Sequence, residues 1–244
     1  MQVESLAIEL RPRPMAEAAD LGMLLVQANA RSIWGTFAPV FLLVALVAAA
    51  SAEIAPWLAS LVLFWLKPWL DRTLLFVVSR AVFGQSTNAV TLWQHRGSVL
   101  WGQWFSTLAW RRFSPWRAFT QPIYQLEGQR GKAKRQRRDQ ILRARRGAAT
   151  MLQVAFANLE MVLFFGVLAV AMWFAPDDNR GDLLHWLFKS DSTVASAVTT
   201  GIYAVVIFVL EPFYVAAGFL MYLNRRVELE AWDIEQEFRR AFGH

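Results

Sequence analysis

Two glutamates lie inside long apolar stretches of the sequence. Glu160 belongs to Met151–Ala175, and Glu211 belongs to Val194–Leu223. A charge at the centre of a bilayer costs about 2.5–3.5 kcal/mol even on the lenient insertion scale, so each carboxylate must face protein or water, or carry a proton. At 1.5 Å per residue, both should lie roughly 15–20 Å from the inner surface, at a shared depth. Chemically, this arrangement suits a site that binds protons or ions.

A structural role competes with that interpretation and is preferred, because the apolar stretches offer few other polar groups to complete a pathway. Glu211 would pair with Lys67 or Arg80, or would hydrogen-bond the backbone freed by Pro212. Lys67 can alternatively extend its long stem to the lipid headgroups. The candidate intramembrane polar residues are Glu160, Glu211, Lys67 and Asp71.

Signals of catalysis are missing from the sequence. It has no zinc-protease histidine pair, no nucleophile elbow, no phosphate-binding loop and no dinucleotide fingerprint. His95, His185 and His244 are too scattered for a metal site, and the absence of cysteine excludes disulfides, thiolate catalysis and cysteine-ligated metals. We therefore expect no enzyme activity, no metal and no cofactor.

The elements that would position the carboxylates are membrane-spanning helices. Two of the four apolar stretches exceed the roughly 20 residues that cross a ~30 Å hydrocarbon layer. The expected fold is an all-α integral membrane protein with four transmembrane helices and interfacial amphipathic helices. The apolar cores of the four spans are Thr36–Ala50, Ala55–Leu66, Met151–Ala175 and Val194–Leu223.

Basic residues set the expected orientation. The turn at Ser51–Ile54 has no lysine or arginine, and the acidic segment 176–193 has few, whereas the long middle segment is strongly basic. The positive-inside rule then puts both termini and the middle segment in the cytoplasm of a bacterial inner membrane. No cleaved signal peptide is expected, because the first apolar run begins past residue 30.

The whole chain is expected to form one membrane domain, 1–244. Its parts are a cytoplasmic N-terminal helix (1–32), a transmembrane hairpin with a kinked second helix (33–84), a cytoplasmic interfacial and basic segment (85–148), a third span (149–175), a periplasmic loop (176–193), a fourth span (194–224) and an acidic C-terminal helix (225–244).

The N-terminal helix, Met15–Ala30, should lie on the inner membrane surface with Leu21, Leu24, Leu25 and Ala28 on its apolar face. Pro68 should kink or break the second span. Beyond it, Leu74–Val82 either continues one long bent helix or lies in the membrane interface.

The middle segment contains tryptophans and arginines at roughly helical spacing. Val99–Trp110 is expected to form a helix on the membrane surface, with a re-entrant helix as the alternative, so the state of 73–112 stays open. Pro115 and Pro122 should then leave a short irregular piece.

The densest charge run, Gln129–Arg146, has nine basic residues against Asp139 alone. The preferred interpretation is attraction to anionic lipid, worth about 1 kcal/mol per residue near the surface. A docking surface for an acidic cytoplasmic protein comes second, and nucleic acid is not expected. The basic residues are Arg130, Lys132, Lys134, Arg135, Arg137, Arg138, Arg143, Arg145 and Arg146. The acidic tail, Val227–His244, is expected to fold back onto this run or to offer a partner an amphipathic face.

Several segments resemble a family of uncharacterised bacterial multi-pass membrane proteins, and the likeness covers most of the chain. More distantly, the chain is similar to the membrane domain of some glycerophosphodiester phosphodiesterases. The resemblance implies an inner-membrane protein encoded near MoxR-type AAA+ ATPases, von Willebrand A-domain proteins and SpoIIM-like or RDD membrane proteins, and it implies no catalytic residues. The segments are Lys67–Arg72, Ser79–Gly84, Trp110–Ser114, Gln125–Gly128, Glu211–Phe219, Tyr222–Arg226 and Glu230–Glu235.

Two functions are therefore predicted. The first is a non-enzymatic inner-membrane scaffold that recruits partner proteins at its cytoplasmic face, with a MoxR-type ATPase system as one candidate. The alternative is a small transporter or channel subunit that uses Glu160 and Glu211. The shortage of intramembrane polar groups favours the scaffold, whose partners would be the anionic bilayer and other proteins of a membrane complex. A homo-oligomer stays open.

Overall fold

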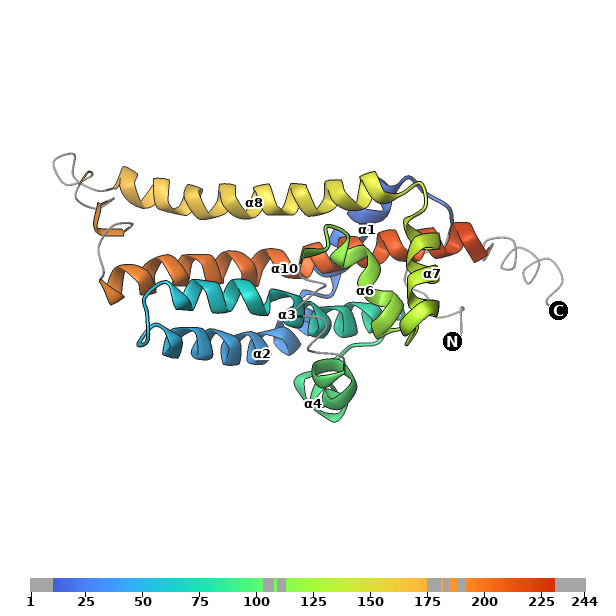
Figure 1. Ribbon diagram of the computed structural model, residues 1–244, viewed down its shortest axis with the longest axis horizontal. Helices are drawn as coiled ribbons and strands as arrows, with labels where there is room; N and C mark the ends of the chain where they lie inside the picture. Colours follow the sequence, from blue (N-terminus) through green and yellow to red (C-terminus); the bar gives the residue numbers. More distant parts are fainter. Residues whose placement is uncertain are drawn as a thin grey trace.

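The computed structural model describes residues 11–102, 108, 113–174, 181, 185–187 and 192–230, and this part of the chain is helical without any strand (Figure 1). The predicted interfacial residues 103–107 and 109–112, most of the loop 175–191 and the tail 231–244 lie outside it. The helices are α1 (Met15–Ala28), α2 (Ala30–Ser51), α3 (Leu58–Val82), α4 (Ala89–Gln94), the π-helical turn η2 (Gly97–Trp101), α6 (Arg117–Gln125), α7 (Gly131–Leu142), α8 (Arg146–Trp173) and α10 (Thr193–Glu230).

Three helices are long and apolar enough to cross a membrane: α2, α8 and α10. They run roughly parallel in Figure 1, with α3 between α2 and α10. The turn from α2 to α3, the last residues of α8 and the first residues of α10 lie at one end of this bundle, which we call the loop end. The other end carries α6 and α7, and we call it the α7 end.

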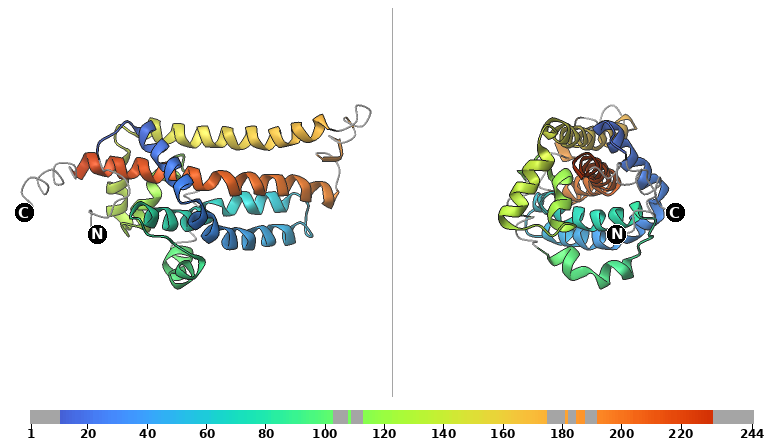
Figure 2. Two further views of the ribbon diagram at one scale, coloured as in Figure 1. Left: turned by 180° about the vertical axis from the view of Figure 1, so that it is seen from behind. Right: turned by 90° about the vertical axis from the view of Figure 1, so that its right-hand side faces the viewer.

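The central element is α10, whose 38 residues give it a length of about 57 Å. This is nearly twice the ~30 Å of a hydrocarbon layer. Its segment from Leu210 to Asn224 is buried almost all round, and α1, α3, α6 and α7 pack against α10 (Figure 2, right). The apolar character of this segment therefore reflects burial in protein as much as contact with lipid.

Glycines allow the neighbouring helices to approach α10 closely. A Cβ atom at Gly22 of α1 would lie 2.5 Å from the carbonyl oxygen of Ala216. At Gly218 of α10, a Cβ atom would lie 2.4 Å from the Cβ of Ala118 on α6. Both distances are far inside van der Waals contact, so α1 and α6 hold their positions only because these residues lack side chains.

The second predicted span continues through its proline. α3 is one helix of 25 residues with Pro68 inside it, so the expected break is absent. Beyond Pro68, residues such as Leu70, Leu74 and Val78 are fully buried. Of the two alternatives for Leu74–Val82, the long helix is the one observed, because this half of α3 packs against α10 and α6 instead of lying in the interface.

The N-terminal helix forms as predicted, but protein covers only part of its predicted apolar face, since Leu25 is buried. Leu24 is 57% exposed, whereas Ala18, Gly22 and Val26 are buried. The small residues lie inside because α1 packs against α10, where only they fit. A protein neighbour, and not the membrane surface alone, determines which side of this helix is covered.

The chain after α3 also packs on protein. Arg72 donates hydrogen bonds to the carbonyl oxygens of Val99 (2.5 Å) and Ser98 (2.9 Å), and Val99 and Leu100 are buried. These two residues therefore contact α3 instead of lying on the membrane surface as predicted. The irregular piece expected around Pro122 is also wrong, because α6 runs through this proline.

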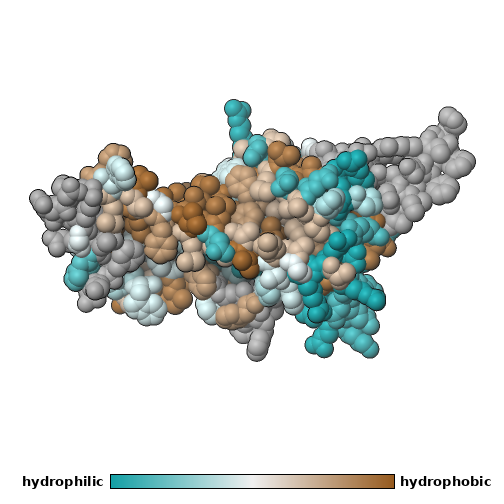
Figure 3. Space-filling view, turned by 90° about the horizontal axis from the view of Figure 1, so that it is seen from above, coloured by the Kyte–Doolittle hydropathy of each residue, from teal (hydrophilic) through white to brown (hydrophobic). Residues whose placement is uncertain are grey.

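Helix α8 is the least covered of the three long helices. Only Ala149, Leu152 and Leu168 are buried along its 28 residues. Apolar side chains such as Val162 (65%) and Val170 (60%) are exposed, and Figure 3 shows hydrophobic surface on this side of the molecule. An apolar surface of this extent is typical of a helix that faces lipid.

Candidate functional site

Five ionisable residues from four helices meet where α3, α8 and α10 pass the N-terminal end of α6. Lys67 and Asp71 lie four residues apart on α3 and therefore share one face of that helix. Glu160 comes from the middle of α8 and Glu211 from α10, while Arg117 is the first residue of α6. We call these five residues the ionic cluster.

Within the ionic cluster, negatively and positively charged side chains alternate in space. The Nζ atom of Lys67 lies 2.5 Å from Glu160 Oε2 and 3.1 Å from Glu211 Oε2. The guanidinium of Arg117 lies 3.2 Å from Glu211 Oε1 through Nη2 and 2.7 Å from Asp71 Oδ2 through Nε. Glu211 thus bridges the two cations, and α3, α6, α8 and α10 are joined by ion pairs.

The cluster is deeply buried. Side-chain exposure is 0% for Asp71, 4% for Glu211, 11% for Lys67 and 20% for Glu160. Among the described residues of the cluster, two cations face three carboxylates. Each buried charge requires a partner, because an uncompensated ion in a low-dielectric interior costs several kcal/mol.

Polar and aromatic groups surround the cluster. The hydroxyl of Tyr214 donates a 2.5 Å hydrogen bond to Gln153 Oε1 on α8 and accepts one from the backbone N–H of Ala118. The guanidinium of Arg117 lies 5.3 Å from the centre of the Tyr214 ring, at cation–π distance. These contacts fix the side chain of Arg117 between α3 and α10.

The structure brings together all four of the polar residues singled out within the spans. Glu160 and Glu211 both reach Lys67, so the two carboxylates lie at the same level of the bundle. The pairing of Glu211 with Lys67 is present, whereas Arg80 lies against the Phe76 ring instead. The alternative in which Lys67 extends to the headgroups is wrong, because two carboxylates hold its ammonium group inside the bundle.

Arg117 is the member of the cluster that sequence reasoning missed. It follows a stretch rich in arginine and was counted with the cytoplasmic charges. In the short, polar helix that Arg117 begins, Ala118, Phe119 and Ile123 are buried. These apolar residues directly after Arg117 were the available sequence signal, because they place it beside a protein core and not in open solvent.

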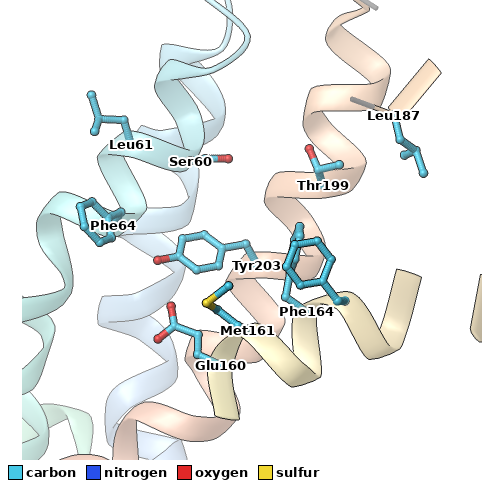
Figure 4. A pocket seen from close by; sticks show the side chains of 10 residues that line it. Ser60, Leu61, Phe64, Glu160, Met161, Phe164, Leu187, Thr199 and Tyr203 are labelled. Atoms are coloured by element: carbon cyan, nitrogen blue, oxygen red, sulfur yellow. The ribbon is translucent and has the colours of Figure 1, made fainter. Parts of the chain in front are cut away.

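A pocket of about 560 Å³ lies between α3, α8 and α10, on the loop-end side of the ionic cluster. Figure 4 shows Ser60 on α3 facing Thr199 on α10, with Glu160, Met161 and Tyr203 deeper inside. The hydroxyl of Tyr203 points toward the Glu160 carboxylate (Figure 4). Glu160 therefore belongs both to the ionic cluster and to the wall of this pocket.

The basic run forms α7 and the short segments on either side of it, up to the first residue of α8. Helix α7 runs across the axis of the long helices (Figure 1). Three of the nine cations of the basic run are half-buried: Lys134, Arg137 and Arg145. The other six are exposed at the α7 end, where Figure 3 shows hydrophilic atoms gathered: Arg130, Lys132, Arg135, Arg138, Arg143 and Arg146. We call these six residues the basic surface.

Half-buried cations attach α7 to the bundle. Arg137 makes a bidentate contact with Glu127, at 3.1 Å and 3.0 Å, and also bonds Glu230 at the end of α10. Burial disfavours the charge of Arg137, but the hydrogen bonds to these two carboxylates outweigh burial and raise the pKa of its guanidinium. Arg145 pairs with Glu228 at 2.9 Å.

The acidic tail was expected to fold back onto the basic run. Glu228 and Glu230 do contact it, but they lie on the straight continuation of α10 and no reversal of the chain is involved. The rest of the tail lies outside the described residues.

Within the described part of the chain, no group of three or more histidines and carboxylates is placed to hold a metal ion. The chain matches no known family model, no curated protein and no solved structure. The family resemblance drawn from the sequence therefore stays a prediction, and the function has to be argued from the site itself.

Proposed function

We propose that the protein is a non-enzymatic scaffold of the bacterial inner membrane that presents the basic surface of α7 to an acidic partner protein. In this proposal the loop end faces the periplasm, and both termini and the α7 end face the cytoplasm. α3 supplies the fourth crossing with its apolar half before Pro68. The positive-inside rule supports this orientation, because the basic surface lies at one end of the bundle.

The observation that carries the proposal is that the cations of the basic run fall into two groups, one paired with carboxylates of the bundle and one exposed. Arg137 and Arg145 are held by carboxylates of α10 and of the turn before α7, so the helix has a fixed position. The six residues of the basic surface point outward from this fixed support. Attraction to lipid depends on charge alone, whereas a rigid set of guanidinium groups suits bidentate binding of carboxylates.

Two acidic residues near the basic surface are turned inward: Glu127 is 11% exposed and Glu228 is 14% exposed, and both are paired with arginines. The exposed Asp139 pairs with Arg138. Among the described residues, the α7 end therefore presents mainly positive charge. The resemblance of the sequence to membrane proteins encoded near MoxR-type AAA+ ATPases makes such an ATPase system the first candidate partner.

A variant that keeps the charge but changes the geometry tests the proposal. Replacing Arg130, Arg135, Arg138 and Arg143 by lysine should reduce recovery of cross-linked partner protein several-fold, because lysine cannot make the planar two-point contact. Binding of the purified protein to vesicles containing anionic phospholipid should stay unchanged. Quantitative mass spectrometry after cross-linking in the native membrane measures the first quantity.

The matched control is Arg31→Lys with Arg96→Lys, two exposed arginines outside α7, which should leave both quantities unchanged. If the lysine variant recovers its partner as well as the unmodified protein does, the basic surface acts through charge alone. Lipid attraction would then replace partner docking as its role.

A second candidate function, a small transporter or channel subunit, is favoured by one observation. Glu160, the most exposed carboxylate of the ionic cluster, lines the pocket between α3, α8 and α10. A buried charge that adjoins a cavity is the usual arrangement at a membrane binding site.

A further inference from the structure

Among the described residues, the pocket between α3, α8 and α10 combines a largely apolar wall with one carboxylate at its inner end. Leu61 and Phe64 come from α3, and Met161 and Phe165 come from α8, while Glu160 is the charged residue of the lining. Its volume of about 560 Å³ falls within the range of pockets that hold small organic molecules. The carboxylate favours a ligand with a positive charge.

Aromatic rings form much of the wall. Phe164 packs edge-on against Tyr203, with ring centres 6.4 Å apart, and against Phe165 at 5.3 Å. Figure 4 shows the ring of Tyr203 directly above Met161 and Glu160. Ring faces attract organic cations by about 0.5–2 kcal/mol each, most strongly where water is excluded.

The position of Glu160 points to the same ligand. Around Glu160 lie Lys67, Glu211, Asp71 and Arg117, together with the phenols of Tyr203 and Tyr214. Glu160 shares Lys67 with Glu211, whereas Glu211 has a second cation in Arg117. Glu160 also has the largest exposure of the cluster and lines the pocket, so it is the carboxylate that a cation in the pocket can reach.

We propose that this pocket binds a lipophilic organic cation, with the positive charge beside Glu160 and the apolar groups against the rings and aliphatic side chains of α3 and α8. The positive charge of the ligand pairs with the Glu160 carboxylate, and the aromatic wall compensates for the water lost by the ligand. The site does not depend on the scaffold role, since it lies on the loop-end side of the cluster and α7 lies at the other end.

Two probes of equal size and opposite charge test this inference: tetraphenylphosphonium and tetraphenylborate. The purified full chain in a neutral detergent should bind tetraphenylphosphonium saturably and should not bind tetraphenylborate saturably, as measured by equilibrium dialysis. Glu160→Gln should weaken the binding of tetraphenylphosphonium by about tenfold or more, because it removes the charge beside the ligand. Phe164→Leu keeps an apolar wall but should weaken binding roughly threefold.

Glu53→Gln, which removes an exposed carboxylate at the loop end, is the control and should bind like the unmodified protein. Equal binding of both probes would overturn the inference and show an apolar groove for lipid chains. No saturable binding, or undiminished binding by Glu160→Gln, would also overturn it. If Glu160→Gln fails to fold, the Phe164→Leu variant tests the inference instead. Undiminished binding by that variant would show that the aromatic wall does not bind the cation, and would overturn the inference. Loss of the scaffold role would appear in partner recovery and not in these binding curves.

Discussion

Replacing Arg117 by methionine is expected to destabilise the protein by about 3–5 kcal/mol, because it leaves buried carboxylates without their partner. Asp71 is 0% exposed, and its Oδ2 atom lies 2.7 Å from Arg117 Nε. Glu211 also loses one of its two cations. The free energy of unfolding, measured by equilibrium denaturation in mixed micelles, gives the size of the effect.

A second substitution should recover much of this loss. In the double variant Arg117→Met with Asp71→Asn, the carboxylate without a partner is gone, so the two changes should be strongly non-additive. Arg138→Met is the control, since Arg138 and Asp139 form a pair in which both side chains are about half exposed, and its removal should cost less than about 1 kcal/mol. Equal losses in Arg117→Met and Arg138→Met would show that the ionic cluster contributes no more than a surface pair.

Replacing Lys67 by methionine is expected to cost a similar amount, about 3–5 kcal/mol. The change keeps the length and apolar stem of the side chain but removes the charge that Glu160 and Glu211 share. Because Lys67–Glu160 joins α3 to the sparsely covered α8, the loss should fall on the attachment of α8 to the bundle. Equilibrium unfolding in mixed micelles again measures it.

Adding Glu160→Gln to Lys67→Met should restore stability in part, since Glu211 still has Arg117 as its partner. Lys132→Met, an exposed lysine on α7, is the control and should change stability by less than about 0.5 kcal/mol. If the losses of Lys67→Met and Glu160→Gln simply add, the two residues are not coupled, and the pair does not hold α8 to the bundle.

The sequence predicts the polar members of the ionic cluster because a charge in an apolar stretch is conspicuous. Lys67, Asp71, Glu160 and Glu211 were all recognised in this way, and the pairing of Glu211 with Lys67 was among the alternatives. Arg117 was missed because it lies in a segment that is already rich in arginine, where one more charge does not stand out. Its role depends on α6 packing beside α10, which is a tertiary contact and not a local pattern.

Hydropathy also does not distinguish burial in lipid from burial in protein. Apolar residues in the second halves of α3 and α10 are covered by neighbouring helices, as the buried Leu74 and Val78 on α3 show. For the same reason the face of α1 that packs against α10 was only partly predicted. Leu24 looks like a core residue, but the close contact with Ala216 admits only a residue as small as Gly22. Helix positions were predictable, and the surfaces through which the helices contact each other were not.

The central claim, that the basic surface faces the cytoplasm of a four-crossing membrane protein, is tested most directly by labelling single cysteines. The natural sequence has no cysteine, so Glu53→Cys at the loop end and Ala133→Cys on α7 each introduce one exposed thiol. In intact spheroplasts, a membrane-impermeant maleimide should label Glu53→Cys and leave Ala133→Cys unlabelled until the membrane is opened. Labelling of Ala133→Cys in intact spheroplasts would contradict the orientation and the cytoplasmic scaffold built on it.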